Sequence, residues 1–195
     1  MAELIYEFRS YRLLPGKATH YLGLLRQHGA AVVSRHLPML GFWMTETGRL
    51  NTLHHLWAYA DMGERAACRA ALMADTRWTE GFVPEAFPLI QAQESRLMQL
   101  ETGSALLSDA TARRKEPVSA EPDDGPVVTE ALHGVSFGGN AAQPEGSIGS
   151  FVTISGEAPG TRVSLFSCDG TTLPAPSGAP SRQELMRPAS FSPLR

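Results

Sequence analysis

The chain has 195 residues, which is long enough for one sizeable domain or two small ones. Its formal net charge is -3, from 17 basic and 20 acidic side chains, and no basic stripe is present, which argues against a nucleic-acid partner. No apolar run approaches the roughly 20 residues of a membrane span. Only two cysteines are present, outside any metal-binding or redox spacing, so the composition predicts a soluble cytoplasmic protein.

The two halves of the chain differ in composition. All three tryptophans lie in the first hundred residues, whereas 10 of the 14 prolines and 11 of the 18 glycines follow residue 101. Between the halves, the segment 108–126 (SDATARRKEPVSAEPDDGP) is polar and interrupted by proline, as exposed linkers are. The composition therefore predicts a domain boundary in this segment.

The first half begins with a predicted strand over 4–13, which ends at the Pro15-Gly16 turn signal. Apolar residues then recur at steps of three and four from 17 to about 35, which predicts an amphipathic helix. Two extended runs rich in aromatic residues and threonine follow, at 40–48 and 51–59, with a short connection between them. This pattern predicts a β-hairpin.

A second helix is predicted to start at the sequence DMGE, 61–64, which has the form of a capping box. A shorter helical piece begins near Thr76, and 89–100 is predicted to be the last strand. The resulting order, strand, helix, strand, strand, helix, strand, is the α+β ferredoxin-like βαββαβ pattern. In this pattern the helices cover one face of the sheet, and the other face needs a partner or water.

The first strand carries two different rows of side chains, because neighbouring residues of a strand point to opposite faces. One row is large and mostly polar, with Glu7, Arg9 and Tyr11, and the other is mostly apolar, with Tyr6 and Phe8. We expect the apolar row to pack on the helices and the polar row to face an enclosed, partly wet space.

Several motifs of the first hundred residues together resemble the NIPSNAP family. They are YEFRSYRLLPGK at 6–17, LGFWMTETGRLNTLHHLWAY at 40–59 with an aspartate at 61, and QESRLM at 93–98. The resemblance covers roughly residues 3–101 and implies a dimeric α+β barrel, in which two sheets pair through their bare faces and enclose a cavity. It therefore implies a homodimer.

In that fold the polar row lines the shared cavity. Strand parity adds alternate residues of the hairpin arms, so the candidate ligand-binding residues are Glu7, Arg9, Tyr11, Trp43, Thr45, His55, Trp57 and Tyr59. Aromatic surface with a few convergent polar groups is typical of small-molecule sites. The alternative is a filled barrel without ligand, because small barrels are often packed with side chains.

The six histidines predict no metal site. His54 and His55 are neighbours on a strand and point to opposite faces, and His20, His28 and His36 do not converge on a helix. His55 shares parity with the polar row, where it is a candidate base or ligand-binding residue, with a packed core histidine as the alternative. The sequence assigns no catalytic residue and no cofactor.

The second half contains a faint copy of the first. The segments 128–141, 149–157 and 163–169 align with 5–18, 41–49 and 55–61, but too few residues separate the first two for a helix. We therefore expect a helix-poor, β-rich degenerate repeat. The predicted organisation is a NIPSNAP-like domain at 1–103, a linker at 104–126, the degenerate repeat at 127–175 and a loose tail at 176–195.

Three functions stay open at this point. The first is a dimeric protein that binds a small molecule or a protein partner. The second is a cofactor-poor oxidoreductase, similar to monooxygenases, that acts on a small aromatic substrate. The third is a non-catalytic interaction scaffold, with the second half as its partner surface.

Overall fold

A computed structural model describes residues 3–119, 125–138, 146–168 and 180–195 of the chain. The first half has four strands and two helical regions, in the order strand, helix, strand, strand, helix, strand. Its elements are β1 (Ile5–Leu13), α1 (Ala18–Leu24), η1 (Leu25–Gly29), α2 (Ala30–His36), β2 (Met39–Thr45), β3 (Thr52–Tyr59), α3 (Met62–Ala74), η2 (Arg77–Phe82), α4 (Val83–Ala86), η3 (Phe87–Leu89) and β4 (Ile90–Gly103). This is the order that the sequence predicts.

The local signals that predict these elements are present as hydrogen bonds. At the start of α3 the Glu64 backbone N–H donates to Oδ1 of Asp61 over 2.8 Å, and the Glu64 carboxylate accepts from the Ala60 backbone N–H. The capping box is therefore formed. The helix expected over 17–35 is continuous but passes through one π-helical segment, η1.

The second half adds strands and one short helix. Its elements are α5 (Ala105–Ala112), β5 (Leu132–Phe137), β6 (Ser147–Ser155), β7 (Arg162–Cys168) and β8 (Arg182–Pro188). Three of these strands, β5, β6 and β7, overlap the segments that the sequence aligns with the first half. Residues 139–141 and 169 of those segments lie outside the described residues. Helix α5 lies within the range predicted as linker, of which residues 120–124 are also outside the described residues.

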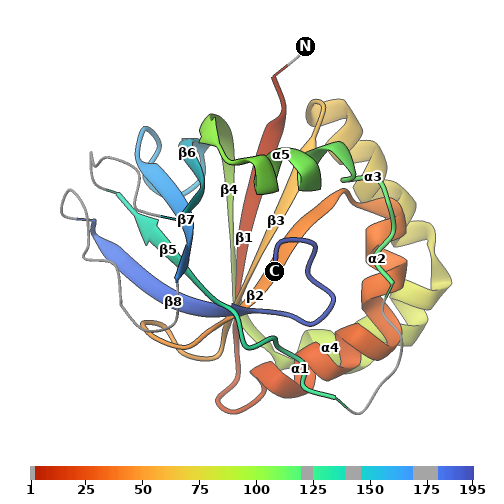
Figure 1. Ribbon diagram of the computed structural model, residues 1–195. Coiled ribbons are helices and arrows are strands. Elements are labelled where there is room, and N and C mark those ends of the chain that lie inside the picture. The colour runs from red at the N-terminus through yellow and green to blue at the C-terminus, as the bar shows by residue number, and fades with distance from the viewer. Residues whose placement is uncertain (1–2, 120–124, 139–145, 169–179) are drawn as a thin grey trace.

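The eight strands of the described residues form one closed barrel, in the order β1-β3-β2-β8-β5-β7-β6-β4, and every pair of them is antiparallel. The first half contributes β4-β1-β3-β2 and the second half β8-β5-β7-β6, and the halves meet at β2–β8 and β4–β6. Figure 1 shows the second half opposite the first, with the helices α1–α4 on the far side of the first half. If β5, β6, β7 and β8 are matched with β1, β2, β3 and β4, the two halves have the same strand order.

The prediction of a loose tail at 176–195 is wrong for residues 180–195, and residues 176–179 lie outside the described part. Strand β8 closes the barrel by pairing with β2 and β5. Met186 in this strand is buried, and so are Ala189 and Leu194, which follow it. The prolines of this segment mislead because Pro188 ends the strand and so removes no interior ladder bond.

The two rows of β1 face the opposite way from our expectation. Tyr6 and Phe8 belong to the apolar core inside the barrel, with Trp43 and Phe151, whereas Tyr11 packs with the helices. The reason is that the second half covers the inner face of the sheet, so the apolar row is buried there. The interior is filled by side chains, as is common in small barrels.

Gly41 allows one close approach in this interior. A Cβ atom at Gly41 would lie 2.1 Å from the ring of Trp43, which is fully buried. A larger residue at 41 would therefore displace the indole from the barrel core.

Three histidines are buried by this architecture: His54 and His133 inside the barrel and His55 under the helices. Burial lowers the pKa of His54 below its ordinary value although Glu184 opposes this, lowers the pKa of His55 well below it, and lowers the pKa of His133 to about 4. All three are therefore neutral in the folded protein near pH 7.

The barrel core should be one unit to which both halves contribute. We expect Phe151→Ala in β6 to lower the free energy of unfolding by about 3–5 kcal/mol, because it leaves a cavity in a closed interior. Ile154→Ala, in the same strand but 43% exposed, is the matched control and should change it by less than about 0.5 kcal/mol. Urea unfolding followed by tryptophan fluorescence measures both, and equal effects would contradict a shared core.

The buried histidines predict a pH dependence of stability. Below the unfolded pKa of about 6.5, each takes up a proton on unfolding that it does not hold when folded, so stability falls as pH falls. Between pH 6.5 and 5 the slope should approach roughly 1.4 kcal/mol per pH unit for each of His55 and His133, and His54 adds to it in the same direction. Urea unfolding at fixed pH values checks this. A flat profile would contradict three neutral buried imidazoles.

Candidate ligand-binding site

A cavity of about 160 Å³ lies between the outer face of the first-half sheet and the helices that cover it. Strands β1, β2, β3 and β4 form its floor, and the helical segments form its walls. The residues that line it are Arg9, Tyr11, Tyr21, Leu25, Val33, Leu37, Phe42, His55, Trp57, Arg69, Leu72, Met73, Trp78, Phe87 and Gln93. The lining is mostly apolar and aromatic, with polar groups from β1, β3, β4 and α3.

Four of the eight candidate residues line this cavity: Arg9, Tyr11, His55 and Trp57. The sequence brings them together correctly because they share strand parity on paired strands, where Arg9 lies opposite His55 and Tyr11 opposite Leu53. Their expected place in the barrel interior is wrong, since the cavity lies on the helix side of the sheet. The sequence pattern identifies the set of residues but not the face.

Glu7 and Tyr59 lie on the same face without lining the cavity. The Arg65 guanidinium of α3 donates two hydrogen bonds to the Glu7 carboxylate, over 2.8 and 3.0 Å, and the Ser95 hydroxyl donates a third over 2.7 Å. Burial raises the pKa of Glu7, but these hydrogen bonds outweigh it and hold that pKa below its ordinary value. Glu7 is therefore an ionised anchor for α3.

Trp43 and Thr45 point the other way, into the barrel. The Trp43 indole N–H donates to Nδ1 of His133 over 3.0 Å, and the Thr45 hydroxyl donates to the Arg49 carbonyl over 2.9 Å. Both are thus separated from the cavity by the sheet, and neither belongs to this site.

His55 has a defined tautomer. The indole N–H of Trp57 donates to Nδ1 of His55 over 2.6 Å, and an indole N–H can only donate, so Nδ1 is the acceptor and Nε2 carries the proton. The imidazole is stacked on Phe42, with ring centroids 4.8 Å apart, and Tyr11 meets it edge-on at 4.6 Å. Among the described residues, the buried Nε2 has no hydrogen-bond partner. His55 is therefore a neutral donor in this geometry, not the base that the sequence suggests.

Two guanidinium groups lie at the cavity. Arg9 donates to the Gln93 side chain over 3.1 Å and its guanidinium carbon lies 5.1 Å from the centre of the Tyr11 ring, which is a cation–π distance. Arg69 of α3 is partly buried and makes no ion pair with any described residue. No described residue that lines the cavity carries a carboxylate. The site is therefore a positively charged apolar cavity.

Sequence reasoning missed the helix residues of the site, because their apolar character predicts only core packing. Leu25 and Trp78 belong to the π-helical segments η1 and η2, which pack against each other beside the cavity. Gly29 permits this contact, since a Cβ there would lie 2.6 Å from Leu25 and 3.0 Å from Phe82. Single π-helical turns occur frequently at functional sites, and nothing in the local sequence announces them.

Metal-binding clusters and membrane-spanning helices are both absent from the described part of the chain. There, no three histidine, cysteine, aspartate or glutamate side chains lie close enough to hold a metal ion together. Within the same residues, no helix combines the length and apolar character needed to cross a membrane.

Known proteins resemble the first half in sequence. The human protein NipSnap homolog 3A (Homo sapiens) is 37% identical over 98 residues, which are 50% of this chain and 39% of that protein. NipSnap homolog 2 of Danio rerio is 38% identical over 101 residues, 48% of this chain and 32% of that protein. The matched region thus spans about two fifths or less of these relatives.

Solved structures extend the comparison. A NIPSNAP family protein of unknown function from Agrobacterium tumefaciens matches with a TM-score of 0.51 and 34% identity, over 53% of this chain and 94% of that one. A monooxygenase candidate from Fusobacterium nucleatum matches 98% of this chain and 94% of its own, with a TM-score of 0.53 and 9% identity. At that identity the second likeness concerns the fold alone, and it includes the second half.

A sequence profile of the NIPSNAP family matches residues 6–104, slightly more than half of the chain. The matched range covers all four strands and the helical layer that build the cavity. It agrees with the range of the motifs in the sequence. The chain therefore belongs to the NIPSNAP family.

Proposed function

We propose that the cavity under the helices binds a small organic anion, with its apolar or aromatic body against the aromatic walls and its carboxylate against His55, Arg9 and Arg69. The observation that carries this proposal is the buried Nε2–H of His55, which has no acceptor among the described residues. A buried donor without a partner costs about 1–3 kcal/mol, and a ligand oxygen would remove that cost.

The charge of the cavity selects an anion over a neutral ligand. Arg9 and Arg69 bring two positive charges, and the described lining brings no negative one. A guanidinium binds a carboxylate through charge-assisted hydrogen bonds, which are stronger than neutral ones. Because His55 is neutral and donates, it adds a hydrogen bond without adding charge.

The size of the cavity limits the ligand. A cavity of roughly 150 Å³ is known to hold one benzene molecule, and this one measures about 160 Å³. We therefore propose a monocyclic aromatic acid, or an aliphatic acid of similar volume, as the ligand class.

The proposal extends to the assembly. We propose that the second half is a degenerate copy of the first and takes the place that a second protomer takes in a dimeric barrel. A homodimer of this chain, which the family resemblance implies, would then have to form through outer surfaces. A cytoplasmic location and a role as a protein-interaction scaffold stay predictions.

Benzoate, benzamide and toluene have similar shapes, so they separate the contributions of charge, hydrogen bonding and apolar packing to binding. Trp57 and Trp78 line the cavity, so tryptophan fluorescence reports on binding. We expect benzoate to bind more tightly than benzamide, which keeps an acceptor but lacks the charge, and benzamide more tightly than toluene, which lacks both.

Arg69→Gln should weaken benzoate at least about tenfold, or 1.4 kcal/mol, and leave benzamide nearly unchanged. Arg35→Gln, which removes an exposed arginine from α2, is the matched control. Equal binding of benzoate and toluene, or no saturation with any probe, would contradict the proposal.

A second candidate function is a cofactor-poor oxidation of a small phenol in the same cavity. It is favoured by the combination of aromatic walls with two guanidinium groups, which would stabilise the phenolate form of a substrate. The Fusobacterium nucleatum protein, a monooxygenase candidate, shares the fold of the whole chain. We expect oxygen uptake with electron-rich phenols, measured with an oxygen electrode, if this reaction occurs. If benzoate still binds but oxygen uptake does not exceed that of a heat-denatured control, the oxidation is contradicted and only the binding function remains.

A further inference from the structure

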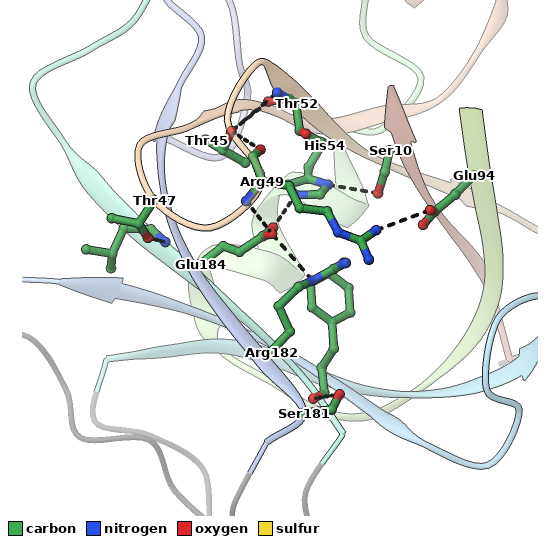
Figure 2. A network of polar contacts seen from close by, with 12 residues as sticks. Ser10, Thr45, Thr47, Arg49, Thr52, His54, Glu94, Ser181, Arg182 and Glu184 are labelled. Carbon is green, nitrogen blue, oxygen red and sulfur yellow. Dashed lines mark hydrogen bonds and ion pairs between the residues drawn. The ribbon is translucent and has the colours of Figure 1, made fainter. Parts of the chain in front are cut away.

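A second polar site lies at the end of the barrel beside the β2–β3 connection, on the other face of the same sheet (Figure 2). It is a cavity of about 80 Å³. Its lining is formed by Ser10, Arg12, Arg49, Thr52, His54, Ala92, Glu94 and Arg182. We call it the barrel-mouth cavity. The strands that form it come from both halves, because Arg182 belongs to β8.

A buried hydrogen-bonded chain forms the base of the barrel-mouth cavity. The neutral His54 imidazole accepts from the Ser10 hydroxyl at Nδ1 over 2.9 Å and donates from Nε2 to Glu184 over 2.9 Å. Glu184 is fully buried and also accepts from the Arg49 backbone N–H over 3.2 Å. Burial raises the pKa of Glu184, but His54 and its other neighbours hold it below its ordinary value, so the carboxylate is ionised. Ser10, His54 and Glu184 therefore hydrogen-bond to one another at the base of the cavity.

The lining of this cavity holds three arginines, Arg12, Arg49 and Arg182, and one acid, Glu94. Arg96 and Arg182 lie over the same ring, that of Phe137, at 4.8 and 4.1 Å, so two like charges are held close together. Arg96 pairs with Glu157 and, over 4.0 Å, with Glu94. Among the described residues Arg182 pairs only with Glu184, 3.4 Å away, which already serves His54 and the Arg49 backbone. Two positive charges on one ring repel each other, and the carboxylates of Glu94, Glu157 and Glu184 offset that repulsion.

Several buried donors here lack an acceptor among the described residues. They are Nε of Arg182, Nη1 of Arg96 and the hydroxyl of Thr52, which is 4% exposed and shares the face of His54. The 3.4 Å contact of Arg182 with Glu184 is an ion pair whose geometry does not make a hydrogen bond. Arg49 differs from this set: its guanidinium is about half exposed and donates to Oε1 of the rim residue Glu94 over 3.5 Å. Oε2 of Glu94 has no hydrogen-bond donor among the described residues.

We propose that the barrel-mouth cavity binds a small oxyanion group, a phosphate or a carboxylate, between Arg49 and Arg182, with the Thr52 hydroxyl as a further donor. Guanidinium forks match the oxygens of both groups. Glu94 opposes an anion at the rim, and binding breaks its contact with Arg49. Because Arg49 and Arg182 come from different halves, the bound group links the halves at the mouth of the barrel. Figure 2 shows both guanidinium groups on the same side of Glu184.

Inorganic phosphate is the first probe, titrated into the full chain by calorimetry at constant ionic strength with chloride as the balancing ion. We expect saturable binding of phosphate. Arg182→Gln should weaken it at least about tenfold. Arg187→Gln is the matched control, since it removes an arginine from the same strand whose side chain pairs with Glu46 away from the cavity, and it should weaken binding less than about twofold.

Thr52→Val removes the hydroxyl but keeps the charge of the protein and the shape of the side chain. It therefore tests the site even if Arg182→Gln does not fold. It should weaken phosphate several-fold while circular dichroism shows unchanged melting. Absence of saturation up to about 10 mM phosphate would overturn the proposal. An equal loss in Arg187→Gln would also overturn it, because it would mean that only the overall charge attracts the anion.

A separate set of ligands tests which molecule supplies the oxyanion group. Phenyl phosphate tests a phosphate group that is carried by a larger molecule, and acetate tests a carboxylate. The binding of each is compared with that of inorganic phosphate. Tighter binding of phenyl phosphate assigns the site to a phosphorylated molecule, and binding of inorganic phosphate alone assigns it to the free ion; both support the site. Arg182→Gln should leave benzoate binding under the helices unchanged, so the two proposals fail independently.

Discussion

Closure of the barrel by the second half is the constraint on which the rest of the structure depends. The β2–β8 and β4–β6 pairings bury the inner face of a sheet whose outer face is already covered by helices. Every residue of β3 is buried as a consequence. A strand buried on both faces has no solvent side, so each of its polar side chains needs a partner or a ligand.

The polar residues of the first-half sheet meet this requirement in different ways. Glu7 is paired with Arg65, which fixes α3 on the sheet. His54 is paired with Ser10 and Glu184, which ties β1 and β3 to β8 across the two halves. His55 has a partner on one nitrogen only. This contrast between a fully paired histidine and its half-paired neighbour is the reason that we propose a binding role for His55 and a structural role for His54.

The sequence predicts local structure well here, because periodicity and turn signals are local. Both arms of the β2–β3 hairpin and the capping box at Asp61 follow from such patterns. Three strands of the second half follow instead from its faint similarity to the first half. The sequence does not predict which row of β1 side chains faces the helices. Alternation separates the two faces of a strand but does not identify the face that the helices cover. Strand β8 was missed because prolines suggest disorder, whereas its pairing is decided by distant strands.

The same reasoning explains which site residues were accessible from sequence. Arg9, Tyr11, His55 and Trp57 lie on neighbouring strands, so parity groups them. Arg69 has no such signal, because a single arginine on a helix usually faces water. Arg182 and Glu184 approach His54 only through barrel closure, which joins residues about 130 positions apart. Contacts that depend on the whole topology are the ones that a local pattern cannot supply.

The adjacent positions of His54 and His55 place the two proposed sites back to back on one strand. A ligand that binds only the folded chain stabilises it, and its effect falls on the contacts that build its site. An anion at the barrel mouth acts on the junction of the two halves, whereas an acid under the helices acts on the packing of α3 against the sheet. Because the two imidazoles are carried by consecutive residues of β3, a shift of that strand moves both. Any influence of one site on binding at the other must then be reciprocal, as linkage requires.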